Sequence, residues 1–156
     1  LRENLLIGMA DPGDDAINAT MLKTGMDKLV AAHPKGLERL ISEGGKGLSG
    51  GQKQLVAFTR LILLAPPILL LDEPTATMDE AQEHQCLRVL QSEAAQGKTM
   101  VIVTHKTSVL PLVSRLIVMS GSQIVLDGPR DEILQKLRTP PAEPVQQTQP
   151  QSEGVS

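Results

Sequence analysis

ILLLDEP, at residues 68–74, is the stretch that decides the fold. Its apolar residues follow Pro66-Pro67 without a polar interruption, and a run of this length is typical of a parallel-sheet strand that is covered on both faces. Asp72 and Glu73 stand at the carboxyl end of this strand, at the edge where α/β proteins bind ligands. Because neighbouring residues of an extended strand point to opposite sides, we expect the two carboxylates to have different tasks.

Predicted helices and strands alternate on both sides of this stretch. Helices are predicted at residues 14–23, 26–32, 49–65, 79–95 and 129–137, with Asp14 or Asp15 capping the first and Pro129 opening the last. Strands are predicted at residues 99–103, 115–119 and 123–127, and residues 35–47 are expected to form a surface loop. The alternation predicts an α/β fold, in which a mainly parallel sheet is flanked by helices and preceded by a small helical segment.

The composition argues against several classes of protein. A net charge of -3, one Phe and no Trp or Tyr provide neither the basic field nor the stacking surfaces of a nucleic-acid-binding protein, so no nucleic-acid partner is expected. The most apolar stretch, residues 61–71, is interrupted by Pro66-Pro67 and is too short to span a bilayer. The single cysteine, Cys86, cannot form an intrachain disulfide.

LSGGQ, at residues 48–52, directly precedes a predicted helix. Ser49 is a good N-cap, and Gly50 and Gly51 let backbone N–H groups approach a ligand without an obstructing Cβ. A helix N-terminus that follows such a loop favours anions. The alternative is an ordinary glycine-rich cap without a ligand.

The carboxylates at the strand end suit magnesium-dependent chemistry. Asp72 would hold Mg²⁺, through water, and Glu73 would orient or deprotonate an attacking water. His105 follows the second strand and could donate a hydrogen bond to a γ-phosphate or to that water. The alternatives are a solvated Asp-Glu pair that caps a turn and a structural histidine.

One apparent phosphate-binding loop is rejected. Gly97-Lys98-Thr99 ends like the GxxxxGK[ST] motif, but Ser92 stands where the first glycine belongs. The motif also connects a strand to a helix, whereas here a helix is predicted before the glycine and a strand after it.

Four motifs in this order and spacing resemble the ATPase domain of ATP-binding-cassette (ABC) proteins. They are LSGGQ at 48–52, ILLLDEP at 68–74, TATMD at 75–79 and IVTH at 102–105, and the resemblance covers residues 1–138. It implies ATP and Mg²⁺ as cofactors and assigns a role to each matching position. Leu48, Ser49, Gly50, Gly51 and Gln52 match the signature motif, Asp72 the Walker B aspartate that serves the metal, Glu73 the catalytic glutamate, Asp79 the D-loop aspartate and His105 the switch histidine.

The same resemblance implies a partner and a domain plan. ABC ATPases act as head-to-tail dimers, in which each site joins the P-loop of one subunit to the signature loop of the other. No P-loop or Q-loop match is present, so the chain is expected to be a C-terminal fragment with both motifs upstream of Leu1. Residues 1–64 would form the helical signature region and residues 65–138 the remainder of the catalytic core, while the Pro- and Gln-rich residues 139–156 are predicted to be disordered.

The subtype is indicated by LRENLLIG at residues 1–8 and ISEGGKG at residues 41–47, which resemble exporters with fused membrane and ATPase domains. Residues 33–52 and 114–134 look most like bacterial type I secretion exporters. Glu43 would then lie in the loop that touches the transmembrane domain, at the cytoplasmic face of the inner membrane. ATP hydrolysis would power export. The alternatives are a soluble ABC ATPase that acts on ribosomes or DNA, and an isolated half-site that binds ATP without hydrolysing it.

Overall fold

The structure is a computed structural model that describes residues 1–138. The chain divides into two compact units, Leu1–Leu112 and a second unit that begins at Val113. The predicted disorder of residues 139–156 lies outside the described residues. The division predicted between residues 64 and 65 stays a prediction.

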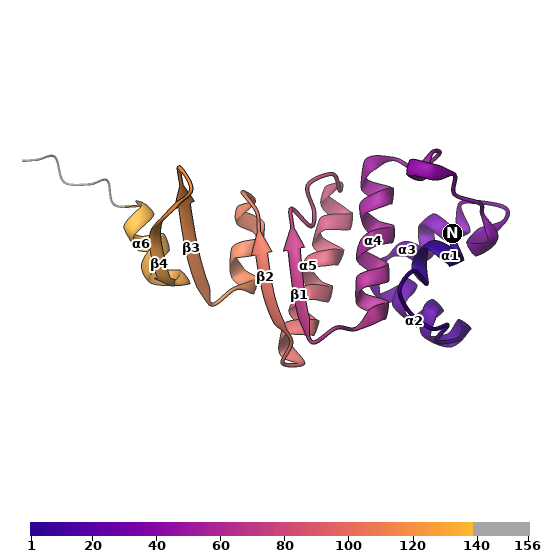
Figure 1. Ribbon diagram of the computed structural model, residues 1–156, viewed down its shortest axis with the longest axis horizontal. Helices are drawn as coiled ribbons and strands as arrows, with labels where there is room; N and C mark the ends of the chain where they lie inside the picture. The colour runs from indigo at the N-terminus through magenta and orange to yellow at the C-terminus, as the bar shows by residue number, and fades with distance from the viewer. Residues whose placement is uncertain (139–156) are drawn as a thin grey trace, which may run out of the picture. The chain divides into compact units, whose positions relative to one another are not determined.

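The first unit contains most of the helices and one parallel strand pair (Figure 1). Its elements are α1 (Arg2–Leu5), α2 (Asp14–Thr24), α3 (Met26–Ala31), α4 (Gly50–Leu64), β1 (Ile68–Asp72), α5 (Glu80–Ala95) and β2 (Thr99–Val103), with short 3-10 helices η1 (Gly36–Glu38), η2 (Glu43–Gly45) and η3 (Thr107–Leu112).

Strands β1 and β2 are parallel neighbours, and helix α5 makes the crossover between them (Figure 1). Ile68 pairs with Thr99 and Asp72 with Val103, so both strands end at the same edge. This register brings the residues that follow β1 next to those that follow β2. The predicted α/β fold with a parallel sheet flanked by helices is confirmed.

The two faces of this strand pair differ. Leu69 and Leu71 are buried in the core, whereas Leu70 is 74% exposed on the other face. Val101, the partner of Leu70 in β2, is 52% exposed. The prediction that β1 is covered on both faces is therefore wrong for one of them, since within residues 1–138 the core lies against one face only.

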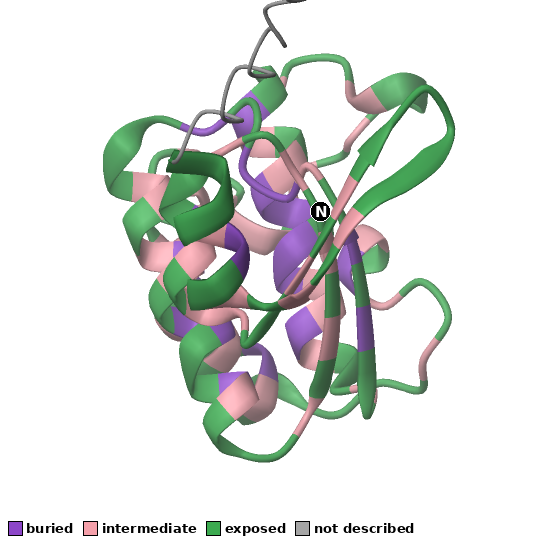
Figure 2. Ribbon diagram, turned by 90° about the vertical axis from the view of Figure 1, so that its left-hand side faces the viewer, coloured by how far each residue is buried: buried purple, intermediate pink, exposed green. Residues whose placement is uncertain are grey.

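The core of the first unit is aliphatic apart from Phe58. Buried residues from helices α1 to α5 and from β1 form one cluster (buried residues are purple in Figure 2). Leu5, Ile17, Leu69 and Leu90 have side chains that are fully removed from solvent. Each such side chain contributes about 1.5–3 kcal/mol to folding, so this cluster is the main source of stability for the unit.

A buried carboxylate also stabilises this unit. Glu93 of α5 is only 2% exposed, and its Oε1 lies 2.5 Å from Nζ of Lys23 in α2, while its Oε2 pairs with Lys98 before β2. Burial alone would raise the pKa of Glu93, but hydrogen bonds from the two ammonium groups outweigh burial and lower the pKa. The triad joins α2 to α5 and to the start of β2.

The second unit is a β-hairpin followed by a helix. Strands β3 (Arg115–Ser120) and β4 (Gln123–Pro129) are antiparallel, with a bulge between Val118 and Met119, and α6 (Arg130–Arg138) follows. The hairpin turn has positive φ at Gly121 and Ser122, the conformation of a two-residue turn between twisted strands.

Two predictions about helix starts are wrong. Pro129 is the last residue of β4, paired with Arg115, and α6 begins one residue later. Neither Asp14 nor Asp15 caps α2, because Gly13 is the N-cap and both aspartates lie in the first helical turn. There their charges still favour the helix N-terminus.

The predicted surface loop at residues 35–47 contains the two short helices η1 and η2, neither of which has a buried residue. None of the helices within residues 1–138 is long and apolar enough to cross a membrane.

Candidate functional site

The carboxyl edge of β1 and β2 brings Glu73 and His105 into contact. His105 Nε2 lies 3.0 Å from Glu73 Oε1, and the backbone N–H of His105 donates to the same oxygen at 3.2 Å. The hydroxyl of Thr104 donates to Oε2 at 3.1 Å. The carboxylate therefore accepts two hydrogen bonds, from the Thr104 hydroxyl and the His105 N–H, and the imidazole of His105 lies in contact with one of its oxygens.

Glu73 has an unusual backbone conformation. Its φ of 44° lies in the left-handed region, which is uncommon for a residue other than glycine and costs of order 1–3 kcal/mol. Its N–H donates to the carbonyl of Val103 at 2.8 Å, directly beyond the end of β1. The prediction that Asp72 and Glu73 alternate as neighbours in one extended strand does not apply, because the strand ends at Asp72.

Asp72 presents an available carboxylate at the same edge. It is exposed, and its side chain has no hydrogen-bond or ion-pair partner within the part of the chain that the structure describes. Among these same residues, no group of three or more His, Cys, Asp or Glu side chains surrounds a possible metal position. A cation at Asp72 would therefore depend mainly on water and on ligand oxygens, which is the coordination that Mg²⁺ favours.

The start of α4 has the cap that the sequence predicts. Ser49 Oγ accepts from the Gln52 N–H at 3.2 Å, and Gln52 Oε1 accepts from the Ser49 N–H at 3.0 Å, which completes a capping box. The N–H groups of Gly50 and Gly51 have no acceptor among residues 1–138. The exposed Gly50 N–H thus remains available to an anion at this helix N-terminus, whereas the Gly51 N–H belongs to a buried residue.

Gly51 is also required by packing within the chain. A Cβ at this position would lie 2.7 Å from the carbonyl oxygen of Thr77, which is too close for any real side chain. At Gly50 the nearest atom would be Thr77 Cβ, at an ordinary 3.5 Å. The N-terminus of α4 therefore lies directly against the turn that follows Glu73, a contact that the sequence analysis missed.

Gln54, also missed by the sequence analysis, connects these two regions. Its Nε2 donates to the Glu73 carbonyl at 2.7 Å. Its Oε1 accepts from the N–H and the hydroxyl of Thr77, at 3.0 and 2.9 Å. The only signal in the sequence is a polar residue directly before the apolar Leu55 and Val56.

The remaining predicted site residues lie nearby with contacts of their own. Asp79 is the N-cap of α5, and its Oδ1 accepts from the Gln82 N–H at 2.8 Å. Leu48 is half-buried and packs against the core. Of the predicted set, the structure thus brings Asp72, Glu73 and His105 to the sheet edge.

The segment after His105 is tied to α5. Lys106 Nζ donates to the Thr75 carbonyl at 2.9 Å and to Glu83 Oε2 at 2.5 Å. Ser108 donates to the other oxygen of Glu83, and the hydrogen bond from Lys106 is the main cause of the lowered pKa of Glu83. The hydroxyl of Thr75 is buried without a hydrogen-bond partner among the described residues. The hydrogen bonds of Lys106 to Thr75 and to Glu83 therefore hold the turn after Glu73 against α5.

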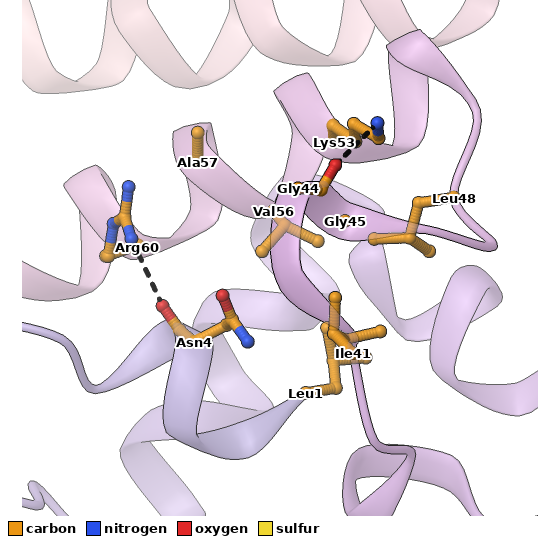
Figure 3. Close-up of a pocket in the computed structure, with 10 residues that line it drawn as sticks. All are labelled: Leu1, Asn4, Ile41, Gly44, Gly45, Leu48, Lys53, Val56, Ala57 and Arg60. Atoms are coloured by element: carbon orange, nitrogen blue, oxygen red, sulfur yellow. Dashed lines mark hydrogen bonds between the residues drawn. The ribbon is translucent and has the colours of Figure 1, made fainter.

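A separate hollow of about 200 Å³ lies beside the loop that contains Glu43. Its lining includes Leu1, Asn4, Ile41, Gly44, Lys53 and Arg60. Figure 3 shows Lys53 hydrogen-bonded to the Gly44 carbonyl, at 2.8 Å, and Arg60 to the Asn4 carbonyl, at 3.4 Å. Both cations are thus engaged by backbone, and neither Glu73 nor His105 lines the hollow.

The rejected phosphate-binding motif is also settled by the fold. Gly97-Lys98 connects the end of α5 to the start of β2. The direction is helix to strand, opposite to that of a P-loop, as predicted.

Comparison with known proteins identifies the family. The family described as "ABC transporter" matches residues 4–76, a range that includes the Ser49 cap, Gln54 and the Asp72-Glu73 pair. The chain belongs to the ABC transporter family. His105 lies beyond the matched range, so its place beside Glu73 rests on the geometry.

Curated relatives of this ABC chain are ATP-binding proteins of transport systems. The glutathione/L-cysteine transport system ATP-binding/permease protein CydC of Escherichia coli is 37% identical over 134 residues, which are 86% of this chain and 23% of the relative. The alpha-hemolysin translocation ATP-binding protein HlyB of Proteus vulgaris is 35% identical over 131 residues, 82% of this chain and 18% of HlyB. The chain thus spans about a fifth of the length of each relative.

A solved structure agrees with the ABC fold. The structure of a bacterial Atm1-family ABC exporter with ATP bound superposes with a TM-score of 0.78 at 26% identity. The match covers 86% of this chain and 23% of the exporter chain.

Proposed function

We propose that the chain is part of an ABC exporter, in which ATP hydrolysis drives transport across a membrane. The chain would contribute to two ATP sites and form one side of each. The observation that carries the proposal is the contact of Glu73 with His105 at the sheet edge next to Asp72. A water-orienting carboxylate, a hydrogen-bond donor and a metal-binding carboxylate are the groups that phosphoryl transfer to water requires.

At the first site the sheet edge performs the chemistry. Asp72 would hold Mg²⁺ through water, which fits its unpaired, exposed carboxylate. When bound, the metal neutralises negative charge on the phosphates. Glu73 orients the attacking water and accepts its proton, and His105 donates from Nε2 to the γ-phosphate or to the water once the contact with Glu73 opens.

At the second site the chain supplies the cap of α4. The N–H group of Gly50, assisted by Ser49, would bind the γ-phosphate of ATP held by a second ATPase domain in a head-to-tail dimer. Leu48, Gly51 and Gln52 complete this motif, and Asp79 lies at the same dimer contact while it caps α5.

The proposed second partner is a transmembrane domain of the exporter. The exposed loop around Glu43 would contact it, and the chain would then lie at the cytoplasmic face of the inner membrane. Support comes from relatives whose names include a permease, and HlyB in particular supports a protein-secretion exporter of type I. A soluble ABC ATPase without a membrane partner is the competing proposal, and spanning helices in the rest of the parent protein would argue against it.

The decisive test is Glu73→Gln in the complete transporter. This variant keeps the size of the side chain but removes the base and replaces one accepting oxygen by an NH2 group, so we expect ATP hydrolysis to fall by about 10²–10⁴-fold. Binding of ATP, measured by equilibrium dialysis, should be retained. Hydrolysis at the unchanged rate would refute the role of Glu73 and with it the proposed function.

A second test concerns the 156-residue chain alone. Its sequence contains no P-loop, so we expect it to show no magnesium-dependent ATP hydrolysis and to act as a half-site that needs a partner's phosphate-binding loop. Release of inorganic phosphate is the measurement. Turnover by the purified chain, lost again on Glu73→Gln, would contradict this half-site proposal.

A further inference from the structure

We propose that Gln54 is a positioning residue for Glu73, and that it couples the anion-binding start of α4 to the catalytic carboxylate. The inference rests on the proposed function, since it assumes that Glu73 activates water. It adds a link within one chain between the two proposed ATP sites, because Gln54 lies on the helix of one site and holds the backbone of the other.

Both ends of the Gln54 amide are engaged in this link. The Nε2 group donates to the carbonyl of Glu73 at 2.7 Å, and Oε1 accepts two hydrogen bonds from Thr77, at 3.0 and 2.9 Å. One side chain therefore spans the turn from Glu73 to Thr77. A carboxylate or an apolar side chain at this position could not donate to the Glu73 carbonyl.

The backbone of Glu73, which Gln54 holds through its carbonyl, requires support from its surroundings. Glu73 has a φ of 44°, and a strained backbone conformation persists only where the surroundings over-determine it. Its N–H is held by Val103, its carboxylate by Thr104 and His105, and its carbonyl by Gln54 and by the Ala76 N–H within the turn. Of these contacts, only the one from Gln54 originates in a helix that also carries an anion-binding cap.

The link to that cap is short and rigid. Gln54 lies in the second turn of α4, which begins at Gly50, and Gly51 already lies against Thr77 without room for a Cβ. A displacement of the helix N-terminus on binding phosphate cannot be absorbed in so tight a contact. We therefore expect it to be transmitted through Gln54 and Thr77 to the Glu73 turn.

The experiment compares Gln54→Glu with Gln91→Glu in the complete transporter. The two variants make the same chemical change, but Gln91 is an exposed residue of α5 whose side chain has no hydrogen bond or ion pair within residues 1–138. For Gln54→Glu we expect kcat to fall by about 10²-fold, the scale of a catalytic group displaced by about 1 Å, with KM for ATP within about twofold of the wild type. Gln91→Glu should leave both values unchanged.

A second readout separates positioning from a general structural role. Groups that act as a unit show non-additive losses, so Gln54→Glu should cause no further loss when it is added to Glu73→Gln. Independent multiplication of the two losses would overturn the inference. An unchanged kcat for Gln54→Glu, or a raised KM with unchanged kcat, would also overturn it.

Gln54→Asn is a second variant that tests the inference even if Gln54→Glu does not fold. It keeps the amide but shortens its reach by one methylene, and we expect it to lower kcat in the same way; a wild-type kcat would contradict the positioning role. The failure of the inference is distinct from that of the proposed function. If Glu73→Gln stops hydrolysis while both Gln54 variants hydrolyse normally, only the inference fails.

Discussion

Two glutamates of the first unit, Glu73 and Glu93, show how differently this fold treats a carboxylate. Glu93 is buried, paired with two lysines and located in a regular helix. Glu73 is at the sheet edge, bonded to neutral donors and to a histidine, and its backbone lies in the left-handed region. The difference indicates that Glu93 stabilises the unit, whereas the strained backbone at Glu73 serves to position the side chain of Glu73.

The two variants Glu73→Gln and Glu93→Gln should therefore separate activity from stability. The largest effect is the loss of hydrolysis already described for Glu73→Gln, at about 10²–10⁴-fold. We expect this variant to leave the free energy of unfolding of the first unit nearly unchanged. A large loss of stability in Glu73→Gln would break the comparison, because both glutamates would then be structural.

For Glu93→Gln we expect a loss of about 2–3 kcal/mol in the free energy of unfolding. Breaking a fully buried pair costs about 3–5 kcal/mol, and the partial exposure of Lys23 reduces that value. Urea unfolding of the chain at pH 7 measures the loss, with the exposed Glu38→Gln as control. An equal stability of the two variants would show that the triad contributes nothing.

The pH dependence of the free energy of unfolding provides a further test of the role of Glu93. The folded-state pKa of Glu93 is lowered, so its contribution is fully present above the unfolded value of 4.5 and is lost as pH falls through the folded pKa. The difference in stability between the wild type and Glu93→Gln should thus shrink as pH falls below 4.5. A difference that grows in acid would contradict the assigned pKa direction.

The smallest expected effect concerns the packing on the Glu73 side. Gly51→Ala places a Cβ 2.7 Å from the Thr77 carbonyl, and we expect a loss of about 1–3 kcal/mol in the free energy of unfolding from overpacking. Gly50→Ala is the matched control, since its Cβ has ordinary contacts and should cause no loss. Equal stabilities of the two variants, measured by the same urea unfolding, would show that the turn after Glu73 shifts at little cost in free energy.

The parts of the fold that depend on local patterns could be predicted from the sequence. The apolar run of β1 and the Ser49 cap of α4 appear as expected, because each follows from residues that are adjacent in the chain. The approach of His105 to Glu73 also follows from sequence, since parallel strands end at a common edge. The roles proposed for these residues remain predictions.

The contacts that were missed are long-range or depend on backbone angles. Gln54 reaches across 19 residues to Glu73, and the apolar Leu55 and Val56 that follow it do not indicate this partner. The left-handed conformation of Glu73 was missed because a glycine, not a glutamate, is the usual signal for it. The open face beside Leu70 was missed because an apolar run does not tell which parts of a chain cover it.

The left-handed backbone at Glu73 limits which amino acids can replace it, whatever the chemistry requires. Valine, isoleucine and threonine branch at Cβ and would be genuine outliers at a φ of 44°. Asparagine, aspartate and glycine adopt this conformation readily, but the first two are one methylene shorter and glycine has no side chain. The residue at this position is thus constrained twice, by the backbone conformation and by the length of the side chain.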